Sequence, residues 1–534
     1  MEYYAKSKKV QFTSERINEI KKNMKNIEEC LKENLTETDV EILNSSITDI
    51  AEKTEEKQKT LKEHHKDIVT CAEMFFLEYG EYFTEKEKKL VVEACRIHDL
   101  GKVNLVFQAM ICPKLAEKFH IDVRKTSQIP HGFLSAVTIS LDEFDDLSEL
   151  FSDKDFGPFI TAVYYHHDRE DHYNSPAIRK YAEKYYMKQI EEYLNRKIRK
   201  LNCSNLDDLL FRNNVYTGKY IPDSNAWKEY LLIKGLLNKF DYTVSAGYEN
   251  AESAIDLHEK KLVKNIEKFL NGKELRPAQK FMKMNRDKNL IVIAPTGSGK
   301  TEASLLWMNG EKSFYTLPLK VSSNAIYLRI KENYEYKDVA LLHSDAMAVY
   351  LREYNGNEDI GEKYERSKML SQPLTVCTVD QLFRFVYRAL GTEIFAATLK
   401  YSKLVLDEIQ AYEPRVIATI IYGLKMIQEM GGKFAIITAT FPPVLKYFME
   451  QYGLVEGKQY IFKDFTGKEY QVEKYPRHKV EIRHSEMNLD EIRLRGKNRK
   501  VLVICNTVSK AQKLYKKLEG ENVWLLHSKY IRRL

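Results

Sequence analysis

Cysteine is scarce in this 534-residue sequence and forms neither a disulfide framework nor a metal knuckle. The seven cysteines are Cys30, Cys71, Cys95, Cys112, Cys203, Cys377 and Cys505. They are odd in number, scattered along the chain, and never arranged as C-x-x-C. We therefore expect a reducing compartment and exclude a cysteine zinc site or a set of structural disulfides.

Long apolar runs are also missing. The start, MEYYAKSKKV, has no apolar signal core, and no later run approaches the length of a membrane span. With 43% hydrophobic and 30% charged residues, the composition is that of an ordinary soluble protein, which we expect to be cytoplasmic and free of membrane. The formal net charge of +7 is small for this length. It permits a nucleic-acid or nucleotide partner without establishing one.

Two sequence patterns divide the chain. The first part, up to about residue 240, spaces its apolar residues at threes and fours, which predicts an all-helical domain. From about residue 288, short apolar runs such as NLIVIAPTGSG, SKLVLDEIQ and KFAIITATF alternate with helical stretches, as is typical of buried parallel strands in an α/β domain. The final stretch, from RKVLVICNT to LLHSKYIRRL, predicts strand, helix and strand, a unit that cannot bury both faces of its strands by itself.

These patterns give four expected segments. Residues 1–255 form the all-α domain, 256–274 a charged linker, 275–470 an α/β lobe with a parallel sheet, and 471–534 the incomplete start of a second such lobe. Residues 345–372, within the first lobe, are expected to form a mobile surface insertion.

Histidine is concentrated in the first half of the sequence. Eight of the thirteen lie between residues 64 and 172: His64, His65, His98, His120, His131, His166, His167 and His172. Imidazole with a carboxylate suits first-row transition metals, whereas all-oxygen sites suit magnesium. In RIHDLGK, Asp99 follows His98, and its two oxygens could bridge two metals that clamp the reacting oxygens of a phosphodiester. Lys102, four residues after His98 and so on the same helix face, could meet the phosphate charge.

An ordered set of these residues resembles the HD superfamily of metal-dependent phosphohydrolases. The set is His64, His98-Asp99, His131, His166-His167 and Asp241 in KFDYTVSAG. The resemblance assigns His64, His98, Asp99 and Asp241 to one metal, and Asp99, His131, His166 and His167 to the other. His65 could replace His64, although the framing L-K-E-H favours His64. We expect two divalent transition metals, manganese, iron, nickel or cobalt.

A phosphate-binding loop is predicted at residues 294–301, APTGSGKT, between an apolar run and a helical segment. Gly297 and Gly299 let backbone amides approach the phosphates of ATP, with Ser298 between them. Lys300 reaches the outer phosphates and the Thr301 hydroxyl can ligate magnesium.

A second nucleotide motif, KLVLDEIQ, ends another apolar run. Asp407 would hold magnesium through its water shell, and Glu408 would orient and deprotonate the attacking water. Further along, Thr438 and Thr440 of ITAT could relay the nucleotide state to the bound strand.

Upstream, LRPAQ offers Arg276 and Gln279 as an adenine-reading pair. In this order and spacing, the segments resemble the first lobe of a superfamily 2 helicase of the DEAD/DEAH kind, with D-E-I-Q as its second motif and Gln410 as a coupling residue. In that family, the loops after the other strands grip the nucleic-acid backbone. The matching residues are Pro318, Lys320 and Asn324 in TLPLKVSSNA and Thr378, Asp380 and Gln381 in CTVDQLF. Such contacts track phosphates, although any one of these residues could equally be an ordinary strand-to-helix cap.

An HD domain followed by such a helicase resembles the CRISPR-associated helicase-nuclease of type I systems. This resemblance implies recruitment to a guide-RNA surveillance complex, ATP-driven translocation on the displaced single-stranded DNA, and cutting of that strand at the HD site. We expect a monomer. The lysine- and glutamate-rich stretch between YYAKSK and LKEHH departs from the usual layout and is expected to form an added helical hairpin.

The end of the sequence carries a further expectation. Helicases of this superfamily close ATP between two lobes, and the second lobe supplies arginines that stabilise the transferring phosphoryl group. The sequence contains VLVICNT and LLHSKY but stops at Leu534, before the arginine-bearing motif. We expect the 534 residues to bind ATP weakly, barely hydrolyse it and not unwind DNA. Two alternatives stay open: an HD nucleotide phosphohydrolase fused to an unrelated ATPase, and a non-catalytic module that docks on DNA or on the surveillance complex.

Overall fold

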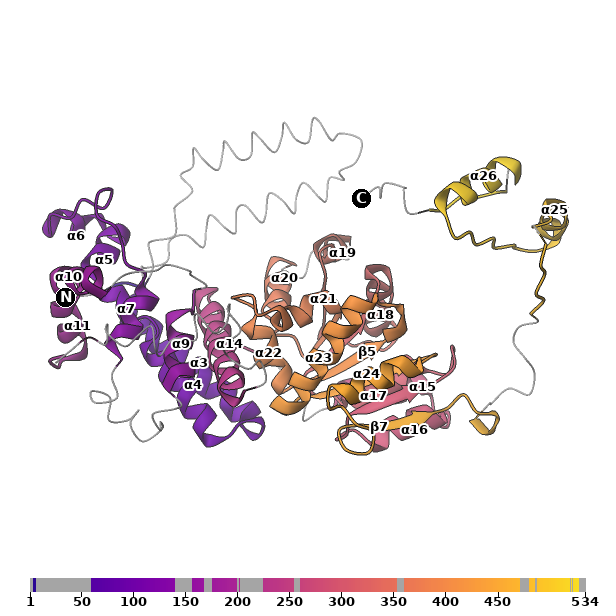
Figure 1. Cartoon of the computed structure of the whole chain (residues 1–534), viewed down its shortest axis with the longest axis horizontal. Helices are drawn as coiled ribbons and strands as arrows, with labels where there is room; N and C mark the ends of the chain where they lie inside the picture. Colours follow the sequence, from indigo (N-terminus) through magenta and orange to yellow (C-terminus); the bar gives the residue numbers. More distant parts are fainter. Residues whose placement is uncertain are drawn as a thin grey trace. The chain divides into compact units, whose positions relative to one another are not determined.

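The structure is a computed structural model that describes residues 3–5, 59–139, 156–167, 175–198, 201, 224–253, 260–352, 360–470, 480–485, 487–518, 520 and 522–527. It divides into two compact units, Met1–Thr466 and Gly467–Leu534. The first unit contains a helical domain and an α/β lobe (Figure 1). The expected added hairpin falls on residues 6–58, outside the described residues.

The regular elements in the described part of the first domain are all helices, apart from one isolated bridge between Tyr4 and Thr60. They are α3 (Leu61–Tyr79), η2 (Gly80–Tyr82), α4 (Glu85–Ile97), η3 (Leu100–Val103), α5 (Leu105–Ile111), α6 (Pro113–Lys118), α7 (His131–Thr138), α9 (Phe156–Tyr164), α10 (Ser175–Tyr185), α11 (Met187–Leu194) and α14 (Asn225–Ser245). Helices α3 and α4 begin at capping boxes, Thr60 with Glu63 and Thr84 with Glu87. Each box satisfies backbone donors that the first turn of a helix leaves free, which fixes where these two helices start.

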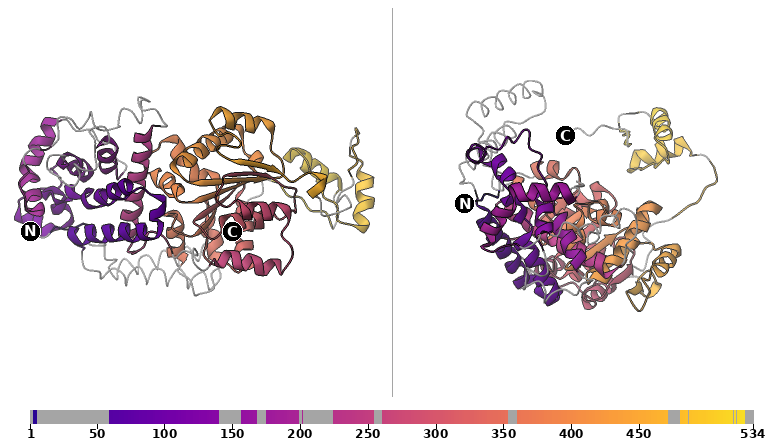
Figure 2. Two further views of the ribbon diagram at one scale, coloured as in Figure 1. Left: turned by 90° about the horizontal axis from the view of Figure 1, so that it is seen from below. Right: turned by 60° about the vertical axis from the view of Figure 1, so that its left-hand side comes forward.

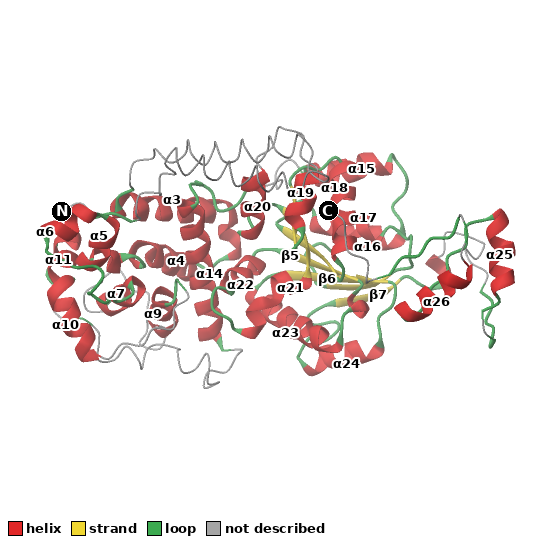
Figure 3. Ribbon diagram, turned by 90° about the horizontal axis from the view of Figure 1, so that it is seen from above, coloured by secondary structure: helices red, strands yellow, loops and turns green. Residues whose placement is uncertain are grey.

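The α/β lobe is built on a seven-stranded parallel sheet of order β3-β4-β2-β5-β6-β1-β7. The strands are β1 (Leu290–Ile293), β2 (Ser313–Leu317), β3 (Val339–Leu342), β4 (Leu374–Thr378), β5 (Lys403–Asp407), β6 (Lys433–Thr438) and β7 (Ile461–Asp464). Helices cover both faces of the sheet (Figure 3). This double cover explains why the strands appear in the sequence as continuous apolar runs. The expected fold class, an all-α domain followed by an α/β lobe with a parallel sheet, is confirmed.

The helices of the lobe alternate with its strands. They are α15 (Lys261–Leu270), α16 (Pro277–Met284), α17 (Lys300–Met308), α18 (Lys320–Glu332), α19 (Ala346–Arg352), α20 (Ile360–Lys368), α21 (Val379–Leu382), η4 (Phe383–Tyr387), α22 (Glu393–Lys400), η5 (Ile409–Ala411), α23 (Pro414–Met430) and α24 (Pro443–Gln451). Helix α15 occupies most of the expected linker, and its Leu262, Val263 and Ile266 are buried. This stretch therefore packs as part of the lobe.

Helices occupy the expected surface insertion at 345–372, and its mobility stays a prediction. Its described residues form α19 and α20, and α20 packs against β3. Tyr350 and Leu370 are buried there, so the apolar residues of this charged stretch anchor it to the sheet. Residues 353–359 lie outside the described part of the chain.

The apolar core is shared by the helical domain and the lobe. The ring of Tyr401 lies 5.1 Å from that of Phe75 and 4.9 Å from that of Tyr79, measured between centroids. Helix α14 packs on α3, α4 and α9 and also on α22 of the lobe. In the left view of Figure 2, α14 lies between the other helices of its domain and the lobe. The two halves of this unit are thus joined by packed side chains.

The second unit contains η6 (Lys468–Tyr470), α25 (Leu489–Asn498) and α26 (Val508–Leu518). The predicted helix of the strand-helix-strand pattern is present as α26. The flanking segments 501–505 and 523–526 are not paired as strands among the described residues, so the strand prediction is wrong there. A strand is defined by hydrogen bonds to a neighbour, and the apolar Leu502, Ile504, Trp524 and Leu526 are exposed in this unit.

Within the described residues, no helix has the length and apolar character needed to cross a bilayer.

Candidate metal and nucleotide sites

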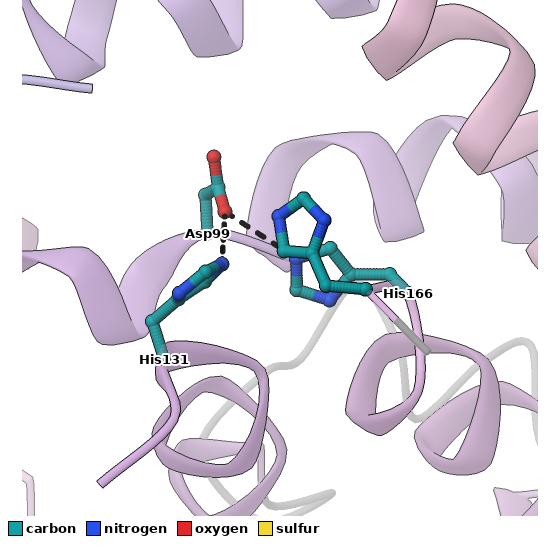
Figure 4. Close-up of side chains that lie close together, drawn as sticks. Asp99, His131 and His166 are labelled. Carbon is teal, nitrogen blue, oxygen red and sulfur yellow. Dashed lines mark ion pairs between the residues drawn. The ribbon is translucent and has the colours of Figure 1, made fainter. Parts of the chain in front are cut away.

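Asp99 lies at the centre of a buried histidine cluster (Figure 4). Its Oδ1 is 3.3 Å from His131 Nε2 and 3.4 Å from His166 Nε2. Its Oδ2 is 3.4 Å from the Nε2 atoms of both His64 and His98. Each carboxylate oxygen therefore faces a different pair of imidazoles, as expected of a carboxylate that bridges two cations.

These contacts form two candidate ligand groups that share Asp99. In each group the ligand atoms lie within 4.8 Å of one another: one is Asp99, His131, His166 and His167, and the other is His64, His98 and Asp99. Asp241 Oδ1 lies 3.2 Å from His64 Nε2, although Asp241 is not a member of the second group. The structure thus brings all the predicted ligands to one place, and their assignment to metals stays a prediction.

Many atoms of this cluster are buried without a hydrogen-bond partner. They are both ring nitrogens of His64 and of His131, Nε2 of His98 and of His166, and Oδ1 of Asp99. A buried polar atom left unpaired costs about 1–3 kcal/mol, so native proteins rarely gather several in one place. Neutral imidazole nitrogens and a carboxylate are the donors that divalent transition metals prefer. The residues therefore fit a pair of such metals.

Local hydrogen bonds orient two of the imidazoles. His98 Nδ1 lies 3.0 Å from the Cys95 carbonyl oxygen, and His166 Nδ1 lies 2.6 Å from the Val163 carbonyl oxygen. Both bonds leave Nε2 directed at Asp99, which is how metal-binding histidines are commonly held.

The turn of RIHDLGK is fixed by Gly101. A Cβ on this residue would lie 2.0 Å from the His131 carbonyl oxygen, so only glycine lets η3 pack against the start of α7. The Gly101 N–H donates to Ser135 Oγ at 2.8 Å, and Ser135 Oγ donates to the same His131 carbonyl at 2.9 Å. Gly101 therefore brings His131 to Asp99.

Burial sets the charge state of the cluster. It lowers the pKa of His131 to about 3 and that of His167 to about 2, and it also lowers the pKa of His166. For Asp99, burial acts to raise the pKa, but the charges of His98 and Lys102 outweigh it and hold the pKa well below its usual value. Neutral His131, His166 and His167 beside an ionised Asp99 are in the protonation states that metal binding requires. For His98 burial acts to lower the pKa, but the charge of Asp99 outweighs it and raises the pKa, so metal binding there would release a proton.

Lys102 contacts Asp99 directly, with Nζ donating to Oδ2 at 2.6 Å. Helix α4 ends at Ile97, so the expectation that His98 and Lys102 share one helix face is wrong. The 3-10 turn η3 brings the ammonium group to the carboxylate instead. A contact between Lys102 and a phosphate stays a prediction.

His64, and not His65, belongs to a candidate ligand group. His65 Nδ1 instead lies 3.1 Å from the Tyr193 hydroxyl. The His65 ring is next to the cluster, with its centroid 5.7 Å from that of His98. Sequence reasoning missed Tyr193, because no spacing pattern connects it to a histidine that lies 128 residues earlier.

The phosphate-binding loop has the conformation that the sequence predicts. Gly297 and Gly299 have φ of 78° and 84°, and α17 begins at Lys300. Arg276 donates from its guanidinium group to the Gly297 carbonyl, and Gln279 Nε2 donates to the Gly299 carbonyl at 3.4 Å. The predicted adenine-reading pair therefore lies against the phosphate-binding loop itself.

Ser298 and Thr301 are the remaining predicted phosphate-site residues beside these glycines. Ser298 Oγ is buried without a hydrogen-bond partner, and Thr301 is buried in the first turn of α17.

A chain of hydrogen bonds joins the loop to the ends of β5 and β6. Lys300 Nζ donates to Glu408 Oε1 at 2.5 Å, and the Gln410 amide donates to Glu408 Oε2. Thr438 Oγ1 then donates to Gln410 Oε1 at 2.5 Å, and the Thr440 N–H donates to Thr438 Oγ1 at 3.2 Å. The three predicted coupling residues thus belong to one network that includes Glu408.

Asp407 has a partner that sequence reasoning missed. The Tyr315 hydroxyl donates to Asp407 Oδ2 at 2.7 Å, whereas Oδ1 has no hydrogen-bond partner. Burial raises the pKa of Asp407 to about 6, against the hydrogen bond from Tyr315 and the charge of Lys300. The sequence did not single out Tyr315, because β2 (SFYTL) also contains Ser313 and Thr316, whose buried hydroxyls need partners as well.

The predicted DNA-contacting residues gather at the carboxyl ends of β2 and β4. Pro318 directly follows β2 in the sequence. Lys320 Nζ lies 3.3 Å from the Asp345 carboxylate, and Asn324 Oδ1 lies 2.7 Å from His343 Nε2. The acidic and imidazole partners, from the loop after β3, were not predicted.

At the end of β4, Thr378 is buried, and the exposed Asp380 accepts a hydrogen bond from Gln381 at 2.7 Å. Contacts of this whole set with nucleic acid stay predictions.

Comparison with known proteins finds similarity in both halves of the chain. The family described as "Cas3, HD domain" matches residues 51–224, and the family described as "DEAD/DEAH box helicase" matches residues 277–448. The CRISPR-associated nuclease/helicase Cas3 of Methanothermobacter thermautotrophicus is 25% identical over 558 residues, covering 91% of this chain and 65% of the relative. The CRISPR-associated endonuclease/helicase Cas3 of Escherichia coli is 25% identical over 190 residues, covering 31% of this chain and 21% of the relative.

Among solved structures, the crystal structure of T. fusca Cas3 superposes with a TM-score of 0.53 and 17% identity, over 75% of this chain and 51% of that one. At this identity the likeness shows the fold. The chain spans about half of that structure and 65% of the M. thermautotrophicus relative.

Proposed function

We propose that this chain is a CRISPR interference effector, because it matches a Cas3 HD domain and a DEAD/DEAH box helicase domain. In this proposal, the HD site cuts single-stranded DNA and the helicase domain moves along that DNA with ATP. The observation that carries this proposal is the position of Asp99, whose two oxygens face two separate imidazole pairs with unsatisfied nitrogens. This arrangement supports a two-metal phosphodiesterase more strongly than a structural polar core.

Each side chain of the site has a proposed task. Two bound divalent metals would activate the attacking water and neutralise the charge that develops on the phosphate. Asp99 would be shared by the two metals, and the histidines and Asp241 would supply the remaining ligands. Lys102 keeps Asp99 ionised and oriented through its 2.6 Å hydrogen bond and supplies positive charge toward the DNA phosphate.

The helicase half is proposed to bind magnesium ATP and the DNA backbone. Gly297, Lys300 and Thr301 receive the phosphates, Asp407 holds the magnesium, and Glu408 orients the attacking water. The bound strand crosses the carboxyl ends of β2 and β4, so nucleotide and DNA meet along one edge of the sheet. The proposed partner is a guide-RNA surveillance complex that exposes single-stranded target DNA, and the names of the CRISPR-associated relatives support it.

Circular single-stranded DNA tests the nuclease. We expect cutting of the circle with manganese, nickel, cobalt or iron, and its reduction by about three orders of magnitude in Asp99→Ala, since the shared carboxylate serves both metals. Asp122→Ala, at an exposed aspartate outside the cluster, is the matched control and should cut normally.

The outcomes separate the rival functions. Hydrolysis of small nucleotides with indifference to the circle would favour an HD nucleotide phosphohydrolase. Binding of DNA or of a surveillance complex, without cutting in any metal, would favour a non-catalytic module. Either result contradicts the proposed nuclease.

Slow ATP turnover by these 534 residues is a separate part of the proposal. Its support is chemical, because arginines from a second lobe contribute to the transition state of this reaction in the helicase superfamily. Rapid hydrolysis that is stimulated by single-stranded DNA would contradict it.

A further inference from the structure

Helix α14 contacts both halves of the first unit. Asp241 faces the metal cluster, with Oδ1 3.2 Å from His64 Nε2. Lys239 precedes it by two residues, which places the two side chains about 200° apart around the helix axis. Lys239 Nζ points to the lobe, where it lies 3.0 Å from the Met369 carbonyl oxygen. It also lies 2.8 Å from Oε1 of Glu252, which follows α14 in the chain. One turn of α14 therefore links the metal cluster to the lobe.

Glu252 is the centre of this contact. It accepts a hydrogen bond at 2.6 Å from the Tyr401 hydroxyl and pairs with the ammonium groups of Lys239 and Lys312. The side chains of Glu252, Lys239 and Lys312 are at most 2% exposed. Lys312 immediately precedes β2, and Tyr401 lies between α22 and β5. Glu252 therefore binds at the amino-terminal ends of the strands, whereas Asp407 lies at the carboxyl-terminal end of β5.

Helix α14 has little freedom to move on this surface. A Cβ on Gly235 would lie 2.4 Å from the Glu393 carbonyl oxygen and 2.5 Å from the Ala397 Cβ, so the backbones of α14 and α22 are in close contact. Near the same place, Lys234 Nζ lies 2.9 Å from Glu393 Oε1. The helix is therefore anchored to the lobe on two successive turns, and the Glu252 anchor is the one beside Asp241.

Removing the Glu252 charge would leave two buried ammonium groups with one fewer counterion. Breaking a buried ion pair by removing one partner is strongly unfavourable, because the remaining charge is not solvated. The lysines can regain water only if the turn containing Lys239 shifts away from the lobe. Since Asp241 lies on the same turn, its carboxylate shifts with it.

We propose that Glu252 is a positioning residue for the metal site: it fixes the turn of α14 that presents Asp241 to His64. The proposal rests on the proposed function, in which Asp241 is a metal ligand. Residues that orient metal ligands without touching the metal commonly change metal affinity by about 10- to 100-fold when they are replaced.

Cobalt binding to the full 534-residue chain tests this proposal. The visible absorption of bound Co²⁺ reports the geometry of its ligands, and the part of the signal that Asp99→Ala abolishes defines the HD site. We expect Glu252→Gln, which preserves the shape of the side chain, to weaken that binding about tenfold and to alter the spectrum. Wild-type affinity together with a wild-type spectrum in this variant would overturn the proposal.

Glu302→Gln is the matched control. Glu302 is also a buried carboxylate, and it accepts a hydrogen bond at 2.6 Å from the Tyr334 hydroxyl and pairs with Arg329, all within the lobe. It should lower the overall stability while leaving the cobalt spectrum of the HD site unchanged. An equal spectral change in both variants would mean that Glu252 acts only through general stability, which also overturns the proposal.

A second variant covers loss of folding. If Glu252→Gln does not fold, Glu252→Asp replaces it, since this variant keeps the charge but withdraws it by one methylene. A cobalt affinity and spectrum unchanged from wild type in Glu252→Asp would also overturn the proposal. Cobalt binding is measured without DNA. A wild-type chain that binds cobalt at Asp99 but cuts no DNA would therefore contradict the proposed nuclease and leave the role of Glu252 standing.

Discussion

The metal site and the nucleotide site differ in how far their buried polar atoms are paired by hydrogen bonds. Around Asp99, imidazole nitrogens of His64, His98, His131 and His166 are buried without hydrogen-bond partners. Around the phosphate-binding loop, most functional groups instead bond one another, from Lys300 through Glu408 and Gln410 to Thr438. Two buried atoms there lack a partner, Ser298 Oγ and Asp407 Oδ1.

The difference follows from the chemistry of the side chains. A neutral imidazole offers one donor and one acceptor, and a carboxylate offers only acceptors, so the cluster has too few protons to pair its inward-facing atoms. An ammonium, an amide and a hydroxyl together supply both donors and acceptors, so the network from Lys300 to Thr438 can pair its own groups. We therefore expect the cluster to be preorganised for metals, and ATP to compete with Glu408 for Lys300.

The largest expected effect concerns metal and stability. If the cluster is preorganised, Mn²⁺ at about 100 times its dissociation constant should raise the free energy of unfolding by roughly 2.7 kcal/mol, because the ion binds the folded state alone. His131→Ala removes one inward-facing imidazole and should lose most of this gain. Urea unfolding with Mn²⁺ and with a chelator measures the difference.

His484→Ala, at an exposed histidine of the second unit, is the control and should behave as wild type. A chain whose stability does not respond to metal would show that the unpaired nitrogens have another explanation, and the contrast between the two sites would fail.

The next effect concerns the bond between Lys300 and Glu408. Glu408→Gln removes the charge that holds Lys300, so the lysine is free to meet the phosphates before ATP arrives. We expect tighter ATP binding, by up to about tenfold or ~1.4 kcal/mol, with slower hydrolysis because the base is lost. Titration with a fluorescent ATP analogue measures the affinity.

Glu413→Gln, at an exposed glutamate five residues further along, should leave the affinity unchanged. Weaker binding of ATP by Glu408→Gln would mean that Glu408 assists the nucleotide more than it competes with it. The nucleotide site would then be as preorganised as the metal site.

The two sites also differ in how they could be predicted from the sequence. The phosphate-binding loop is local, since Gly297, Gly299 and Lys300 act through a turn that eight consecutive residues encode. The metal cluster collects ligands from α3, α7 and α14 and from the segments that follow α4 and α9. Histidine and aspartate are rare enough at buried positions that their order was informative. Both sets of residues meet in the structure.

What the sequence did not reveal were partners that meet only through the tertiary fold. Tyr315 contacts Asp407 across 92 residues, and Tyr401 contacts Glu252 across 149. Tyrosine and glutamate occur throughout the chain, so no spacing singles these out. The strands expected at 501–505 and 523–526 failed for a related reason, because a strand depends on a neighbour and not only on its own apolar residues.

The contact between α14 and the lobe differs from both sites, because its buried charges, Glu252, Lys239 and Lys312, are paired with each other. It carries the smallest expected effect. Burial lowers the pKa of Lys312 to about 7 from a usual 10.5, despite the nearby Glu252. Between these two values the unfolded chain binds more protons at Lys312 than the folded chain, so the free energy of unfolding rises with pH. Below pH 7 both states are protonated and this contribution disappears.

From pH 7 to 8 we expect the free energy of unfolding to rise by about 1 kcal/mol in wild type, a gain that is absent in Lys312→Met. Urea unfolding of both proteins at the two pH values measures this, and equal slopes would show that Glu252 keeps Lys312 charged, with the contact between α14 and the lobe fully paired.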